Sequence, residues 1–159
     1  MIKKLNNKNS LDILEFINRV KDIYQDMYIT KNKERIFLTD LKLIEKVLKY
    51  NEIYAIDDRG IHALLIILKE KGYRTYIKIL VEKNNYIYDL FKFLHWNYNG
   101  CELFLKVKKE NPITKIAQSF YLDQMHLKKQ WEFCGNRGNE ILLIHKKGVQ
   151  DGRNRRKTT

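Results

Sequence analysis

The amino-acid sequence predicts an α/β fold built on one mixed sheet. Residues 73–82 carry apolar side chains at every second position, the period of a strand, and residues 86–96 carry them at helical spacing. Residues 52–69 predict two earlier strands with short connections, as in an antiparallel meander. Residues 130–145 alternate around a turn with two glycines and predict a closing hairpin. A strand that follows the helical crossover is expected to lie parallel to residues 73–82.

The first fifty residues predict one short strand and two helices. Residues 2–5 predict an edge strand, and Ser10 is the expected cap of a helix over residues 10–24. Residues 25–35 are polar and aromatic without a period, so we expect a loop there. A second helix over residues 40–50 follows, with the threonine before it as its expected cap.

The middle of the chain predicts the meander itself. Residues 52–56 form its first strand, and the next four residues form a turn in which Gly60 supplies a positive φ. Residues 61–69 form the next strand. Its centre is apolar without alternation, which is typical of a strand covered on both faces.

The second half of the chain supplies the remaining elements. Residues 101–107 predict a strand, and Asn111 with Pro112 predicts a helix start, because proline is tolerated in a first turn. Residues 130–134 and 140–145 predict the two closing strands. The predicted element order is therefore β-α-α-β-β-β-α-β-α-β-β.

Length and composition limit the class of protein. The chain has 159 residues with 44% hydrophobic content, which predicts a single domain over residues 1–146. Its apolar runs are shorter than the roughly 18 residues of a membrane span, and no signal peptide is visible, so we expect a cytoplasmic protein. Cys101 and Cys134 lie in apolar strand patterns and are expected to be buried thiols. The cysteine and histidine spacings fit no metal site, so none is expected.

The chain is strongly basic, with a formal net charge of +12. A surplus of this size favours a polyanionic partner such as nucleic acid, and it also serves solubility. Residues 147–159 are rich in Gly, Asn, Arg and Lys, which predicts a flexible basic tail. The candidate nucleic-acid contacts are Lys146, Lys147, Arg153, Arg155, Arg156 and Lys157. Such side chains contact phosphates and read no base edges.

The element order and two stretches of sequence resemble the GNAT superfamily of N-acetyltransferases. Residues 103–107, Leu-Phe-Leu-Lys-Val, followed by Asn111, resemble the family's fifth strand and the asparagine that opens its fourth helix. Residues 131–143 resemble its closing hairpin. The resemblance covers about residues 1–146. This ending also resembles small GNAT-like proteins encoded by tailed phages, some of which are virion components.

The resemblance implies a place for acetyl-CoA. In the family, the pyrophosphate lies on a glycine-rich loop between the fourth strand and the third helix, and residues 82–86 match that loop. This chain has no glycine there to let the backbone approach phosphate closely, and Glu82 would repel a pyrophosphate. Both departures argue against acetyl-CoA binding. The residues assigned to cofactor binding are Lys83, Asn84, Asn85, Tyr86 and Asn111.

The resemblance also implies two catalytic positions. Glu82 ends the predicted central strand and is the candidate base for an amine, with a solvated strand end as its alternative role. The family's acid is a tyrosine seven residues after the asparagine, where this chain has Gln118. Tyr121, one turn further on, is the candidate acid, with burial in the core as its alternative role.

Two functions follow from these residues. The first is a non-catalytic basic binding or structural protein that contacts nucleic acid non-specifically or a virion protein, in the cytoplasm or in a phage particle. The second is an active N-acetyltransferase that moves an acetyl group from acetyl-CoA to an amine. The altered phosphate loop and the basic tail favour the first function, whereas the predicted fold favours the second.

Overall fold

The computed structural model describes most of the first hundred residues and three strands beyond them. The described residues are 2–23, 27–31, 34–69, 75–98, 102–108, 113, 131–137 and 140–145. The chain divides into two compact units, Met1–Ile87 and Tyr88–Thr159, each considered by itself. The prediction of one domain over residues 1–146 therefore stays a prediction. The expected basic tail lies outside the described residues.

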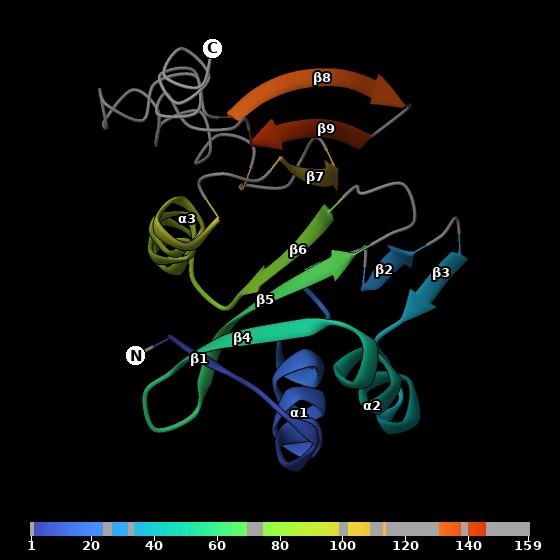
Figure 1. The fold of residues 1–159 in the computed structure, drawn as a ribbon. Helices are drawn as coiled ribbons and strands as arrows, with labels where there is room; N and C mark the ends of the chain where they lie inside the picture. The colour runs from blue at the N-terminus through green and yellow to red at the C-terminus, as the bar shows by residue number, and fades with distance from the viewer. Residues whose placement is uncertain are drawn as a thin grey trace, which may run out of the picture. The chain divides into compact units, whose positions relative to one another are not determined.

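The described part of the first unit contains a meander and an edge strand (Figure 1). The strands lie in the order β1 (Ile2–Lys4), β4 (Glu52–Asp57), β5 (Ile61–Lys69) and β6 (Thr75–Val81). Each neighbouring pair is antiparallel. The predicted meander and the predicted edge strand near the N-terminus are therefore confirmed.

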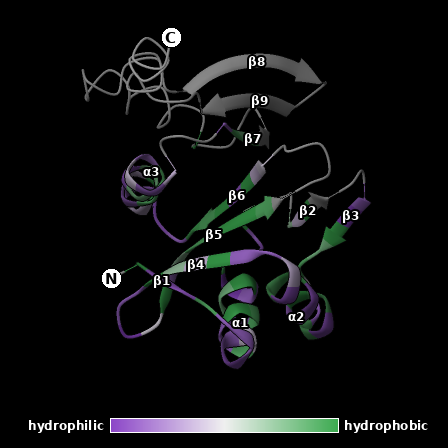
Figure 2. Ribbon diagram, viewed as in Figure 1, coloured by the Kyte–Doolittle hydropathy of each residue, from purple (hydrophilic) through white to green (hydrophobic). Residues whose placement is uncertain are grey.

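Two amphipathic helices cover one face of these strands (Figure 1). Helix α1 (Ser10–Val20) packs against β5, and helix α2 (Leu41–Tyr50) packs against β4. Ile13, Phe16 and Ile17 of α1 are buried. Full burial of a side chain of this size stabilises the fold by about 1.5–3 kcal/mol. Figure 2 shows both hydrophobic and hydrophilic residues on each helix, as amphipathic packing requires.

Strand β5 is hydrophobic along most of its length (Figure 2). The side chains of residues 63–68 are each at most 2% exposed, although they point alternately to opposite faces of the sheet. This burial confirms the prediction that the apolar, non-alternating run is a strand covered on both faces. It also fixes the register with β6, where Leu64 lies opposite Leu80 and Leu65 opposite Ile79.

The prediction of a loop over residues 25–35 is wrong. Strands β2 (Tyr28–Lys31) and β3 (Glu34–Phe37) form an antiparallel hairpin there. Ile29 lies opposite Ile36 in this hairpin, and Ile29 is only 2% exposed. Each strand has four residues, which is too short for an alternation to stand out from a polar surrounding.

Both predicted helix caps are also wrong. Ser10 is the first residue of α1, because a short 3-10 helix, Asn7–Asn9, precedes it and is capped by Asn6. The Ser10 hydroxyl donates instead to the Asn7 carbonyl, at 3.0 Å. Helix α2 is capped by Asp40, whose carboxylate accepts a hydrogen bond from the Lys42 amide at 2.8 Å.

Helix α3 (Asn85–Asn97) follows β6, which confirms the predicted strand-to-helix passage. In the second unit, β7 (Leu103–Lys108) pairs with β9 (Glu140–His145), and β9 pairs with β8 (Trp131–Arg137). Both pairs are antiparallel, so the closing hairpin is confirmed. The expected parallel pairing of the strands on either side of α3 joins the two units and stays a prediction.

We expect Asp40→Ala to lower the free energy of unfolding by about 0.5–2 kcal/mol, because the Lys42 amide loses its acceptor. Thr39→Ala is the matched control and should change stability by less than about 0.5 kcal/mol. Urea denaturation of the two variants measures the difference. A larger loss at Thr39 than at Asp40 would contradict the observed cap.

Candidate functional site

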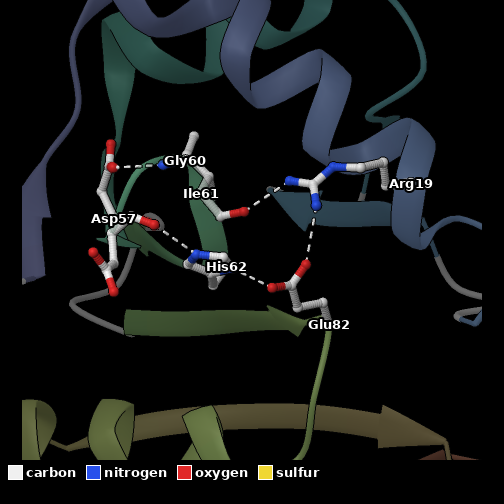
Figure 3. A network of polar contacts seen from close by, with 7 residues as sticks. Arg19, Asp57, Gly60, Ile61, His62 and Glu82 are labelled. Atoms are coloured by element: carbon white, nitrogen blue, oxygen red, sulfur yellow. Dashed lines mark hydrogen bonds and ion pairs between the residues drawn. The ribbon is translucent and has the colours of Figure 1, made fainter.

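Glu82 stands directly after β6 and faces a histidine on the neighbouring strand. The register pairs Ala63 with Val81, so the next opposed pair is His62 and Glu82. The Glu82 amide donates to the His62 carbonyl at 3.1 Å, which extends the ladder by one rung. The Nδ1 atom of His62 contacts Oε1 of Glu82 (Figure 3). The pair is therefore a direct consequence of the antiparallel register.

The second oxygen of Glu82 is held by Arg19 from helix α1 (Figure 3). Nη1 of Arg19 donates to Oε2 of Glu82 at 3.0 Å, and Nη2 donates to the Ile61 carbonyl at 2.8 Å. The guanidinium also lies over the Phe16 ring, with its carbon 5.4 Å from the centroid. Arg19 thus links α1 to the beginning of β5 and to the end of β6.

Both ring nitrogens of His62 face hydrogen-bond acceptors. Its Nε2 atom lies 2.8 Å from the Asp58 carbonyl oxygen, which can only accept. Its Nδ1 atom faces the Glu82 carboxylate, which accepts in its ionised form. The hydrogen bond to Glu82, followed by the one to Asp58, raises the pKa of His62 above its ordinary value. The ring is therefore an imidazolium over a wider pH range than a free histidine.

The turn between β4 and β5 holds the Asp58 carbonyl in place. The Gly60 amide donates to Oδ1 of Asp57 at 3.2 Å, and Lys3 of β1 pairs with Oδ2 of Asp57 at 2.9 Å. The Lys3 hydrogen bond, with a smaller contribution from Gly60, lowers the pKa of Asp57 below its ordinary range. Gly60 has φ 138°, so the prediction of a positive φ there is confirmed.

The passage from β6 to α3 contains most of the residues assigned to cofactor binding. The Tyr86 amide donates to the Lys83 carbonyl at 3.2 Å, so it already has an acceptor. Lys83, Asn84 and Asn85 are exposed, and among the described residues their amides have no backbone acceptor. The Tyr86 ring stacks on His62, with centroids 5.5 Å apart and planes at 13°. The first turn of α3 thus rests on the same histidine that contacts Glu82.

Comparison with solved structures identifies the fold. An N-acetyltransferase from Staphylococcus aureus Mu50 matches with a TM-score of 0.65 and 15% identity, over 92% of this chain and 96% of that one. A GNAT-family acetyltransferase from Streptococcus pneumoniae matches with a TM-score of 0.60 and 15% identity, over 92% and 97%. The spermidine/spermine N-acetyltransferase of Vibrio cholerae matches with a TM-score of 0.60 and 13% identity, over 98% and 96%.

This chain has the GNAT fold. No protein-family model and no curated protein matches the sequence. At 13–15% identity, these three structures establish the fold alone. The fold class predicted from the element order is therefore confirmed.

In this GNAT-fold protein, both carboxylate oxygens of the candidate base Glu82 accept hydrogen bonds. Each carboxylate oxygen of Glu82 already accepts a charge-assisted hydrogen bond, one from Arg19 and one from His62. When its ring is protonated, His62 has no ring lone pair with which to accept a proton. An ionised carboxylate has about four lone-pair sites, so proton uptake by Glu82 would weaken these two hydrogen bonds without having to break either of them first. The role of Glu82 as a base stays a prediction.

The structure of this GNAT-fold protein describes only some of the site residues that the sequence predicts. The structure brings Glu82 and Tyr86 together around His62, which the sequence analysis missed. The register of the predicted hairpin of residues 61–69 and 73–82 could have found His62, because residue 62 lies opposite residue 82 in it. The predicted acid Tyr121, the residue Asn111 and the six basic contacts lie outside the described residues.

The described part of the chain offers neither a metal site nor a membrane helix. The His, Cys, Asp and Glu side chains described form no group of three that could hold a metal ion. None of the described helices has the length and apolar character needed to cross a membrane.

We expect the pKa of His62 to fall when Glu82 is replaced by glutamine, because the amide keeps an acceptor but removes the negative charge. NMR titration of the His62 ring should give a value above about 6.5 in the natural protein and a lower one in Glu82→Gln. Equal values in the two proteins would contradict the assigned contact.

The raised pKa of His62 also predicts how stability depends on pH. The folded chain binds the His62 proton more tightly than the unfolded chain does. The contribution of this proton to the free energy of unfolding is therefore complete below about pH 6.5. The contribution is lost as pH rises through the higher folded pKa. Urea denaturation at several pH values should show this loss in the natural protein and a flatter profile in His62→Gln. A contribution that instead grew with rising pH would contradict the prediction.

Proposed function

We propose that this protein uses the GNAT fold to bind a polyanion and not to catalyse acetyl transfer. The observation that carries the proposal is the network of Arg19, Glu82 and His62. Arg19 and His62 each engage one oxygen of the candidate base, and both ring nitrogens of His62 face acceptors. Proton uptake by this carboxylate would weaken both hydrogen bonds, because each depends on its negative charge. The network uses these groups to join α1, β5 and β6.

The passage between β6 and α3 supports weak or absent acetyl-CoA binding. A pyrophosphate needs several backbone amides that point at it from a loop able to approach closely. Residues 82–86 contain no glycine, and the Tyr86 amide donates within the first turn of the helix. Glu82 adds a carboxylate at the start of this passage. These features reduce the number of donors available to a phosphate.

Net charge supports a polyanionic partner. A protein with a net charge of +12 attracts nucleic acid over long range, and its basic tail can neutralise phosphates without reading bases. The closing hairpin resembles that of GNAT-like proteins of tailed phages. We therefore propose a non-catalytic protein that contacts nucleic acid through its backbone, with a phage particle and its virion proteins as the setting.

An active N-acetyltransferase is the second candidate, and one observation favours it. The amides of Lys83, Asn84 and Asn85 have no backbone acceptor among the described residues, at the start of a thirteen-residue helix. In this reading, Glu82 would remove a proton from an amine, and the amine would attack the thioester carbonyl. Tyr121 would then protonate the leaving thiolate. The acceptor of one matched structure is spermidine or spermine, which carries such amines.

Calorimetry with acetyl-CoA separates the two candidates. We expect no dissociation constant in the micromolar range, because the phosphate passage lacks glycine and begins with a carboxylate. The melting temperature should likewise stay unchanged, whereas saturation at a hundredfold over Kd would stabilise the fold by about 2.7 kcal/mol. An active N-acetyltransferase of the same fold is the control. Micromolar binding that Lys83→Ala weakens would favour the enzyme.

Removal of the basic tail tests whether the protein binds a polyanion through it. Each phosphate contact adds roughly −0.9 to the slope of log affinity against log salt on B-DNA. A chain that ends at Lys147 loses four basic residues, so its slope should be flatter by roughly 3 to 4 units. The decrease in slope should be equal on two unrelated duplexes, because the tail contacts phosphates and reads no base edge. Equal slopes for the full chain and the shortened chain would contradict a DNA contact through the tail.

A further inference from the structure

The hairpin of β2 and β3 carries two different faces. Tyr28 lies opposite Phe37, and two positions further along Thr30 lies opposite Arg35. Side chains two positions apart on a strand share a face, so Tyr28, Arg35 and Phe37 lie together on what we call the aromatic face. Ile29 is on the opposite face and is buried.

The aromatic face combines rings with cations. The Tyr28 and Phe37 rings meet edge to face, with centroids 5.6 Å apart and planes at 62°. The guanidinium carbon of Arg35 lies 4.6 Å from the Tyr28 centroid, and Nζ of Lys78 lies 5.7 Å from it. Arg35 is exposed, whereas Lys78 of β6 is buried at 9% exposure. Tyr28 is therefore enclosed by Phe37, Arg35 and Lys78.

Phe37 remains accessible in this arrangement. Its side chain is 50% exposed although it is one of the largest apolar residues in the chain. Its backing by the Tyr28 ring and by a paired strand fixes its orientation, so little conformational entropy is lost when a flat ligand stacks on it. In the sequence just before it, residues 31–35 read Lys-Asn-Lys-Glu-Arg, with three cations against one anion.

We propose that the aromatic face binds single-stranded nucleic acid, with a base stacked on Phe37 and a neighbouring phosphate paired with Arg35. The inference rests on the proposed function and narrows it to one class of polyanion at a defined site. Every base has a π-face that stacks on an aromatic ring, and cations beside the ring follow the backbone. Both faces of a base are covered by stacking in a duplex, so the site selects unpaired strands.

The composition of the face favours nucleic acid over a protein partner. A protein docking surface of this kind has an apolar core with few charges at its centre. Here Arg35 lies directly on an aromatic ring and the adjoining sequence is basic. Arginine stacks on flat groups and forms hydrogen bonds to phosphate with the same guanidinium. Alternating rings and cations are the pattern expected for a single-stranded nucleic acid.

The chain provides a matched control at the end of α2. Tyr50 is 60% exposed, and Nζ of Lys49 lies 5.5 Å from its centroid. It offers a similar ring beside a cation, on a helix end and away from the hairpin strands. Tyr50→Ala should therefore leave binding of single strands within about twofold of the natural protein, since surface contacts outside a site contribute little.

The experiment measures binding of a fluorescent oligothymidylate to the full chain by anisotropy across a salt series. Phe37→Ala should weaken binding roughly 5- to 150-fold, the effect of removing one stacked base, without changing the salt slope. Arg35→Gln should flatten the slope by roughly 0.7, the contribution of one phosphate contact on a single strand. Phe37→Leu keeps an apolar side chain without the ring and should lose as much affinity as Phe37→Ala. Thermal melts check that each variant folds.

The outcomes distinguish a failure of the stacking site from a failure of the proposed function. Equal losses for Phe37→Ala and Tyr50→Ala, or full affinity in Phe37→Leu, would overturn the stacking site. If duplex binding that depends on the tail persisted in that case, the proposed function would stand without it. If the full chain bound neither duplex nor oligothymidylate, both the site and the polyanion proposal would be overturned.

Discussion

The carboxylate of Glu82 is the interaction on which the described part of the first unit most depends. It joins Arg19 of α1 and His62 of β5 at the end of β6, and the same arginine reaches the Ile61 carbonyl. Through His62 the contact extends to the Asp58 carbonyl in the turn before β5. These side chains are 22–48% exposed, so each ion pair adds little stability by itself. Together they fix the positions of α1, β5, β6 and the turn before β5 relative to one another.

This arrangement limits what the strand end can do chemically. A carboxylate held between a guanidinium and an imidazole ring serves as a structural junction of α1, β5 and β6. Residues 82–86, which follow β6, contain no glycine to let the backbone approach a phosphate closely. Both departures occur within five residues of each other, in a chain whose fold is otherwise that of N-acetyltransferases. Different residues determine the fold of a protein and its chemistry.

Periodicity predicted the long elements and missed the features set by local geometry or by distant contacts. β5 and β6 were predictable because seven or more residues repeat one pattern. Thr39 and Asp40 both have capping side chains, and only the extended backbone of Asp40 (φ −140°, ψ 141°) decides between them. Arg19 meets Glu82 across 63 positions of sequence, a distance that no local pattern encodes. The contact of His62 with Glu82 could have been predicted, because the register of the β5–β6 hairpin sets the two residues opposite each other.

The electrostatics of the Glu82 junction follow from the protonation of His62. With the ring protonated, two cations surround one carboxylate, and the junction carries a charge of about +1. Around it, Lys3 and Arg59 balance Asp57 and Asp58, so the nearby turn adds no net charge. Loss of the His62 proton as pH rises makes the junction neutral and removes one of the two donors of the ring. The attraction of this strand end for an anion and the strength of its hydrogen bonds therefore weaken together, because a single proton controls both.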